Sequence, residues 1–325
     1  MKRFAFRLAA ALVTAATGVT VVALLPSRRP PEPKQLASRL QPPAPARPDT
    51  SPTPEEDEPH RLDDIYVTSP KWSYAGYDIE RTYDDATGQS TATIRKGGKV
   101  VAKHEDGWMG EDSTLAGLFS FLGGGTKQLV VMQYSGGAHC CWSYHIYDFN
   151  PRLRLIYDGD EYDAESVGYT LRPKDLDGDG RFEFTRAVMA FDYFHMSHAA
   201  SVFPVAVFAY DERAGKYRPA NRKFADYVMR GLEGDVGRVA EERAKVRPGG
   251  APANEGFISS VLQVTLKYVY AGREAEGLEF FEREYNLADK AEIKADMLKA
   301  LKGDLVHQSL YGGQRAKKPS KTAAR

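Results

Sequence analysis

Strand-like segments separated by turn sequences run from residue 62 to residue 219, and this pattern constrains the fold of the chain more than any other. The segments are rich in β-branched and aromatic residues, and the turns at residues 84–88, 96–99 and 212–216 are typical of hairpins. We therefore predict a mainly β domain at residues 61–220. Its expected strands cover residues 64–69, 75–83, 90–102, 128–134, 143–149, 152–158, 183–191 and 201–210.

After residue 220 the pattern changes to that of helices. Apolar residues recur at intervals of three and four, which gives each helix one apolar stripe. Asp289 followed by Glu292 is a capping-box pattern at the start of the last helix. We predict a helical C-terminal region at residues 221–310, and thus an α+β chain overall. The two stripes are Ile258, Val261, Leu262, Thr265, Leu266 and Val269, and Ala291, Ala295, Leu298, Leu301 and Leu305.

The N-terminal segment, residues 1–25, has the layout of an export signal. Three basic residues among the first seven precede an uncharged apolar run at residues 8–25. This run of 18 residues is just long enough to span a bilayer. The segment is either a cleaved signal peptide or a signal anchor. We favour the anchor, because Arg28 and Arg29 would hinder translocation of a cleaved signal.

Two segments lack the pattern of a folded core. Residues 26–60 hold 11 of the 19 prolines, which predicts an extended linker that keeps the folded part away from the membrane. Residues 311–325 are predicted to be a basic, disordered tail. The whole chain has 44 basic and 44 acidic residues, so its net charge gives no reason to expect nucleic acid as a partner.

An acidic loop at residues 175–183 is the strongest site motif. Aspartates at alternate positions place hard oxygen donors on one side of a turn, and Gly180 permits the bend that turns the next carbonyl inward. The loop is not an EF-hand, because its twelfth position is Arg186 instead of glutamate. Without a cation it would be an ordinary Asp- and Gly-rich turn. We predict bound Ca²⁺, because unneutralised aspartates repel one another. The expected ligands are the side chains of Asp175, Asp177, Asp179 and Glu183 and the carbonyl of Arg181.

This pattern, Asp-x-Asp-x-Asp-Gly-x-x-acid leading into a strand, resembles the FG-GAP repeats of integrin-type β-propellers and of many bacterial envelope proteins. The resemblance implies that the loop joins strands of a blade and that Ca²⁺ stiffens the turn without catalysis. It also implies a second copy, and residues 121–131 keep the turn-then-strand layout with glycines in place of acids. About 160 residues suffice for three or four blades, so we expect propeller-like units and not a full ring.

The only two cysteines, Cys140 and Cys141, are neighbours in the string Gly-Gly-Ala-His-Cys-Cys, which resembles strings in bacterial envelope proteins with FG-GAP-like loops. In an oxidising compartment they are expected either as a strained disulfide or as two buried thiols. A redox-active pair is less favoured, because thiol exchange prefers the Cys-x-x-Cys spacing.

A second metal site is an alternative prediction. If the two units are related, His139 and the cysteines occupy the same loop as His195 and His198 of the next unit. Imidazole and thiolate donors together suit Cu or Zn. The chain would then be a periplasmic transition-metal binding protein.

Enzymatic motifs are absent from the sequence: it has no Gly-x-Ser-x-Gly, no phosphate-binding glycine loop and no His-Glu-x-x-His. A hydrolase acting on an envelope polymer is a further alternative, using carboxylates from Asp158, Asp160, Glu161 and Asp163. We expect instead a non-enzymatic interaction module of the bacterial envelope. It would be periplasmic, anchored in the inner membrane through its N-terminal segment, with an envelope protein or polymer as its partner.

Overall fold

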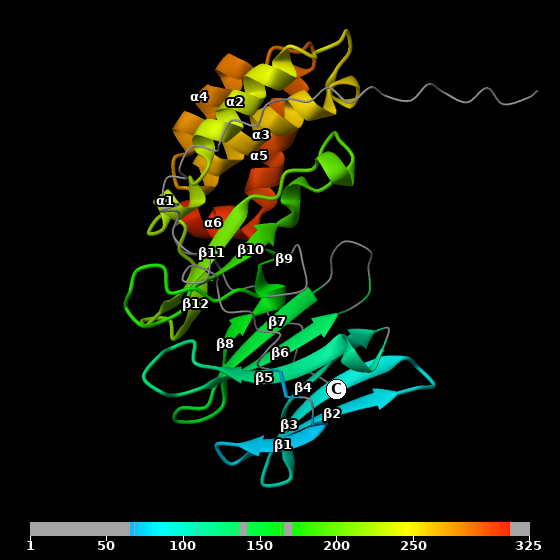
Figure 1. The fold of residues 1–325 in the computed structure, drawn as a ribbon, viewed down its shortest axis with the longest axis vertical. Helices are drawn as coiled ribbons and strands as arrows, with labels where there is room; N and C mark the ends of the chain where they lie inside the picture. Colours follow the sequence, from blue (N-terminus) through cyan, green and yellow to red (C-terminus); the bar gives the residue numbers. More distant parts are fainter. Residues whose placement is uncertain are drawn as a thin grey trace, which may run out of the picture. The chain divides into compact units, whose positions relative to one another are not determined.

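Three four-stranded antiparallel sheets are followed by a helical region (Figure 1). This computed structural model describes residues 66–67, 69–108, 110–134, 136, 142–162, 164–165 and 171–312, all within the unit Pro54–Arg325. The N-terminal segment, the whole proline-rich linker, residues 61–65 of the β domain, and residues 313–325 of the tail lie outside the described residues. No helix in the described ranges has the length and apolar character needed to span a bilayer.

Each sheet is a meander in which neighbouring strands follow one another in the chain. The first sheet contains β1 (Lys71–Tyr74), β2 (Tyr77–Asp84), β3 (Gln89–Lys96) and β4 (Lys99–Trp108). The second contains β5 (Thr114–Phe119), β6 (Gln128–Tyr134), β7 (Trp142–Asp148) and β8 (Arg154–Asp158). The third contains β9 (Ala164–Glu165), β10 (Phe184–Val188), β11 (Val205–Asp211) and β12 (Lys216–Pro219).

The helices are α1 (Ala225–Val228), α2 (Leu232–Arg243), α3 (Glu255–Tyr270), α4 (Glu274–Glu284), α5 (Lys290–Gly303) and α6 (Leu305–Tyr311). Short 3₁₀ turns are η3 (Glu111–Ser113), η4 (Gly159–Glu161), η5 (Met189–Phe191), η6 (His198–Ala200) and η7 (Ala251–Ala253). The mainly β architecture followed by helices agrees with the fold class expected from the sequence.

Strand β6 shows how the sheets share their cores. Six of its seven residues are buried, because both of its faces are covered. Val130 and Met132 belong to the larger buried cluster, whereas Leu129 and Val131 belong to a smaller one shared with the first sheet. A strand buried on both faces reads as a continuous apolar run, and β6 has this composition.

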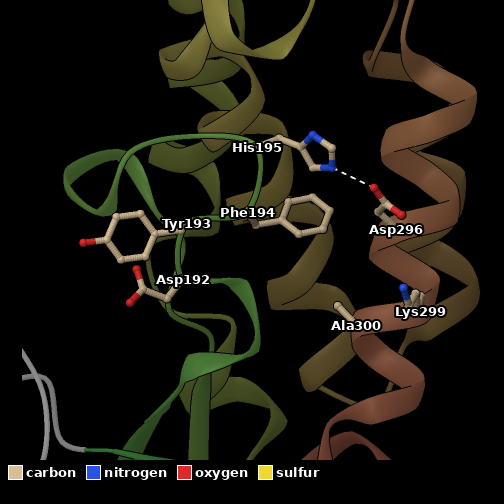
Figure 2. A pocket seen from close by; sticks show the side chains of 7 residues that line it. All are labelled: Asp192, Tyr193, Phe194, His195, Asp296, Lys299 and Ala300. Carbon is tan, nitrogen blue, oxygen red and sulfur yellow. Dashed lines mark hydrogen bonds and ion pairs between the residues drawn. The ribbon is translucent and has the colours of Figure 1, made fainter. Parts of the chain in front are cut away.

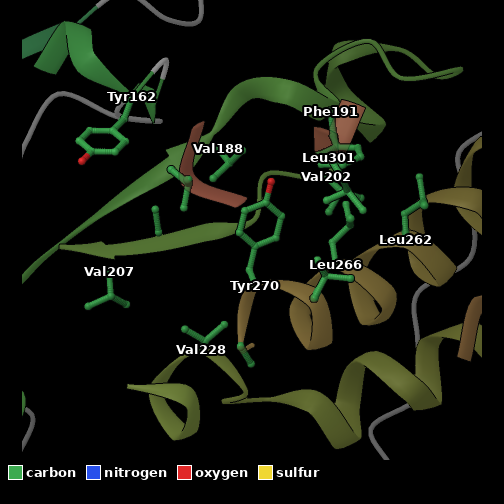
Figure 3. Packing of buried hydrophobic residues seen from close by; sticks show 14 of the residues in the cluster. Tyr162, Val188, Phe191, Val202, Val207, Val228, Leu262, Leu266, Tyr270 and Leu301 are labelled. Carbon is green, nitrogen blue, oxygen red and sulfur yellow. The ribbon is translucent and has the colours of Figure 1, made fainter. Parts of the chain in front are cut away.

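The larger core joins the second and third sheets to the helices. Helix α3 is apolar around most of its circumference, as expected for a buried helix. Figure 3 shows where Val188 and Val207 of the third sheet and Leu266 and Tyr270 of α3 contribute to this core. The third sheet, which carries the acidic loop, is thereby fixed to the helical region.

The predicted boundaries differ from the structure in several places. The expected strand at 90–102 is two strands, β3 and β4, joined by the turn between Lys96 and Lys99. Strands β1, β5, β9 and β12 were not expected. The last predicted stripe is divided, because α5 ends at Gly303 and Leu305 begins α6. Tyr311, assigned to the tail, is the last residue of α6.

Candidate functional site

The acidic loop folds around Asp175. Its Oδ1 accepts a hydrogen bond from Gly178 N at 2.7 Å, and its Oδ2 accepts one from Gly180 N at 2.9 Å. Gly180 has a φ of 81°, a conformation that costs glycine little. A two-way backbone pair between Lys174 and Glu183 closes the base of the loop, immediately before β10.

Three carboxylates of this loop converge. One ligand oxygen each from Asp175, Asp177 and Glu183 lies within 4.8 Å of the others. Glu183 is only 3% exposed, and its carboxylate accepts a hydrogen bond from Leu176 N at 2.9 Å. Burial raises the pKa of Glu183. Such a cluster offers the hard oxygen donors that Ca²⁺ takes.

A lysine from outside the loop supplies positive charge beside the cluster. The ammonium group of Lys223 forms an ion pair with Asp177, and this contact lowers the pKa of Asp177 and raises that of Lys223. Glu183 itself forms no ion pair with any residue that the structure describes. The lysine therefore neutralises Asp177 at the rim of the cluster and acts on the buried carboxylate of Glu183 without forming an ion pair with it.

The other two predicted calcium ligands are placed differently. Asp179 is not a member of the three-carboxylate cluster, and its Oδ1 accepts a hydrogen bond from Arg181 N at 2.8 Å. The side chain of Arg181 pairs with Glu212, so the prediction for this residue concerns its main-chain oxygen alone.

The glycine-rich loop that follows Phe121 lies against the acidic loop. Phe182 N donates a hydrogen bond to Phe121 O at 2.9 Å. A Cβ atom built on Gly123 would lie 2.3 Å from Gly180 O, so the two backbones touch. The hydroxyl of Tyr217 donates to Phe182 O at 2.9 Å and reaches Phe121 O at 3.4 Å. The two loops that the sequence relates to one another are thus in direct contact, each before the second strand of its sheet.

His195 lines a pocket of about 670 Å³ between the segment after η5 and helix α5 (Figure 2). His195 Nε2 lies 2.8 Å from Asp296 Oδ2, and Glu292 is the third member of this possible ligand group. Tyr193 and His195 both have positive φ values, 53° and 52°, which are uncommon for residues with a side chain.

His198 pairs with a different carboxylate, since its Nδ1 lies 2.7 Å from Asp192 Oδ1. His195 and His198 do not share a ligand group among the residues with described side chains. His139, Cys140 and Cys141 lie outside the described residues, so the Cu or Zn site across the two loops stays a prediction, as do the disulfide and the buried thiols.

The carboxylates considered for hydrolysis do not all lie in one group. Asp158 and Asp160 lie with His145 in a third possible ligand group, and Glu161 pairs with Lys216. Asp163 is outside the described residues. None of the three described carboxylates lines the pocket beside His195.

Sequence reasoning did not single out His145. The polar residues Ser143 and His145 alternate along β7, which is a weak signal that both face the same side of the sheet.

Comparison of the chain with protein-family models, curated proteins and solved structures found no match.

Proposed function

We propose that this chain is an exported, membrane-anchored envelope protein whose β region is a Ca²⁺-stabilised interaction module without enzymatic activity. The observation that carries the proposal is the unpaired, buried carboxylate of Glu183 next to Asp175 and Asp177. A buried carboxylate that forms no ion pair is costly, and a bound divalent cation offsets that cost.

The expected role of the ion is to hold the loop and its neighbours together. Asp175 organises the turn, Glu183 immediately precedes β10, and the contact between Gly123 and Gly180 transmits the loop conformation to the second sheet. Calcium would thus stabilise one side of the β region and perform no chemistry. Export is supported by the N-terminal apolar run and the proline-rich linker of the sequence.

We also propose that the sheets are blade-like units related to the FG-GAP type. Each is a four-stranded antiparallel meander, which is the form of a propeller blade. In the second and third sheets, the glycine-rich loop and the acidic loop occupy the same position, before the second strand.

The test is a thermal melt of the full-length protein in mild detergent, with and without millimolar Ca²⁺. A ligand that binds only the folded state stabilises it by about 2.7 kcal/mol at a hundred times its Kd, so the midpoint should rise. An unchanged midpoint would refute the calcium assignment.

The variant Glu183→Gln is a more specific test, because it should change the melting midpoint differently in the absence and in the presence of calcium. Removing a buried charge should raise the midpoint without calcium, whereas the increase caused by calcium should be lost. Glu212→Gln is the matched control, since it removes an exposed carboxylate that contacts the same loop through Arg181. An equal calcium shift in Glu183→Gln and in the control would contradict the site.

A further inference from the structure

A second cluster of possible metal ligands lies in the second sheet, away from the acidic loop. His145 on β7 faces Asp158 on β8, since the two are direct cross-strand partners, and Asp160 follows in η4. One ligand atom from each residue lies within 4.8 Å of the others. His145 is 5% exposed, and its Nδ1 is buried without a hydrogen-bond partner among the described residues.

The protons of this cluster can be assigned from its hydrogen bonds. The hydroxyl of Ser143 donates its single proton to Asp160 Oδ1 at 2.8 Å. The same hydroxyl lies 3.4 Å from His145 Nε2, and it has only lone pairs left to offer there. We assign the ring proton to His145 Nε2, because the serine oxygen can accept it and Nδ1 has no hydrogen-bond partner among the described residues. In the neutral imidazole, Nδ1 then has a lone pair and no proton.

This lone pair faces a carboxylate. His145 Nδ1 lies 3.4 Å from Asp158 Oδ1, which is longer than the roughly 2.7–2.9 Å of a charge-assisted hydrogen bond. An imidazole lone pair and a carboxylate at this distance repel each other, and either a proton on Nδ1 or a shared cation removes the repulsion. Tetrahedral Zn²⁺, with bonds of about 2.0–2.2 Å to nitrogen and oxygen, places its ligands about 3.3–3.5 Å apart. The observed separation agrees with that spacing.

We propose that His145, Asp158 and Asp160 bind a divalent transition-metal ion of the Zn²⁺ class. Ser143 is the positioning residue. Its hydroxyl oxygen accepts from His145 Nε2, and its proton is donated to Asp160 Oδ1. Metal-bound histidines commonly have their other ring nitrogen held in this way. Gly159 lets the two strands approach, since a Cβ there would lie 2.7 Å from both Ser143 Oγ and Tyr144 O. Asp160 is exposed, so the cluster can be reached from solvent.

The group formed by His195, Glu292 and Asp296 gives no such indication of a bound cation. His195 Nε2 and Asp296 Oδ2 are 2.8 Å apart, a hydrogen-bond distance that needs no cation. A serine-nucleophile interpretation of Ser143, His145 and Asp158 also fails. The serine proton goes to Asp160 instead of the imidazole, and the pocket lies elsewhere.

The test is calorimetric titration of the full-length protein with Zn²⁺ in saturating Ca²⁺, so that the acidic loop is already occupied. The wild-type protein should bind one Zn²⁺. Asp160→Asn changes an exposed residue and should fold normally, yet it should weaken binding about a hundredfold or more, because loss of outer partners alone costs about ten- to a hundredfold. Ser143→Ala should show that smaller loss, and His145→Gln the larger one.

His195→Gln is the matched control, because it removes a histidine from the other carboxylate group, and it should bind Zn²⁺ like the wild type. Failure of the wild type to bind Zn²⁺ would overturn the proposal. So would unchanged binding in both Asp160→Asn and His145→Gln, and so would loss of binding only when Cys140 and Cys141 are replaced by serine. These outcomes are independent of calcium binding, which is measured separately with Glu183→Gln.

Discussion

Lys223 is the residue at which the charge of the acidic loop is most easily changed. Its ammonium group pairs with Asp177 and lies near the position where a cation would be held by the three carboxylates. A lysine there offsets part of their repulsion in the calcium-free protein and repels an incoming ion. Lys223 is thus expected to weaken calcium binding.

We predict that Lys223→Gln tightens Ca²⁺ binding about tenfold at low ionic strength, a factor that corresponds to about 1.4 kcal/mol of removed repulsion. Calorimetry at low and high salt measures this, and the gain should shrink as salt screens the charge. Arg222→Gln is the control, since its guanidinium lies 4.8 Å from the ring of Tyr311 and does not contact the loop. Weaker binding in Lys223→Gln would mean that the lysine supports the ion-bound form.

Arg186 explains why the loop has no glutamate at its twelfth position. The loop ends at Glu183, and Arg186 lies within β10, where it is 3% exposed. Its guanidinium donates to the hydroxyl of Tyr157 at 2.9 Å and to Trp142 O at 3.2 Å. The sequence excluded an EF-hand correctly, and the structural reason is that this position already belongs to a strand.

At the scale of elements, the contact between the two loops makes a steric prediction. Gly123 has a φ of 66° and Gly124 a φ of 64°, so alanine is strained at both. Only at Gly123 does the added methyl group meet a backbone atom, Gly180 O, whereas nothing lies within 4 Å at Gly124. Gly123→Ala should therefore destabilise the protein by about 1–3 kcal/mol more than Gly124→Ala, as overpacking does.

Chemical unfolding of the two variants measures the difference. Gly123→Ala should also bind Ca²⁺ more weakly, because displacing Gly180 disturbs its hydrogen bond to Asp175. Equal stabilities for the two alanine variants would show that the loops separate readily and do not support each other.

The junction between α5 and α6 gives a prediction about pH. Asp304 is 6% exposed and accepts hydrogen bonds from Tyr270 Oη and His307 N, both at 2.7 Å. Burial outweighs these donors and raises the pKa of Asp304 above its usual 3.8. The folded state then binds more protons than the unfolded state as pH rises past 3.8, so this group lowers the free energy of unfolding at neutral pH.

Asp304→Asn should therefore raise the free energy of unfolding at pH 7 and have little effect near pH 3, where the carboxyl group is protonated in both states. Urea unfolding at the two pH values measures this. Glu233→Gln, an exposed change on α2, is the control and should show no such pH-dependent gain. A loss of stability at pH 7 in Asp304→Asn would mean that the ionised carboxylate is preferred in the fold.

The elements predicted best are those whose pattern is local. β6 was predicted at its observed bounds, and the stripe from Ile258 to Val269 lies within α3. β12 was missed because it is short and ends in Pro219, which an edge strand tolerates. Asp289 is at the start of α5 as predicted, but its side chain accepts from Ala251 N at 2.6 Å instead of capping the helix. The side chain of Asp289 thus bonds Ala251, which is distant in the sequence, and not the first turn of its own helix.

The two candidate metal-binding clusters differ in the same way: one is formed by residues close in the sequence and the other by a tertiary pairing. Asp175, Asp177 and Glu183 lie within nine residues of one another, so their spacing is legible in the sequence. The pairing of His145 with Asp158 depends on the register between β7 and β8, which includes a shift between Ile146 and Tyr147. Sequence periodicity does not reveal such a shift, and the histidine was therefore not foreseen.

For the molecule as a whole, the two buried clusters predict unequal local stability. The larger cluster draws on the second and third sheets and the helices. Among the described residues, the first sheet contributes four buried side chains to the smaller cluster, Tyr77, Ile79, Ala92 and Ile94, with Trp72, Tyr74 and Ala102 partly buried against them. Segments with few buried apolar contacts open at a lower free energy than the rest of a domain. The first sheet should consequently open before the others.

Native-state hydrogen exchange measures this order. Amides of β1 and β2 should exchange faster than those of β10, β11 and α3. Added Ca²⁺ should slow exchange in residues 171–188, which contain the acidic loop and β10, and leave β1 and β2 unchanged, because only the larger core includes the strand that follows the loop. With Glu183→Gln the difference between the sheets should remain while the calcium effect disappears. Equal protection of β1 and β10 would mean that the smaller cluster couples the first sheet to the rest in a single unfolding step, and a calcium effect spread evenly over all three sheets would place the ion at the centre of that cooperative unit.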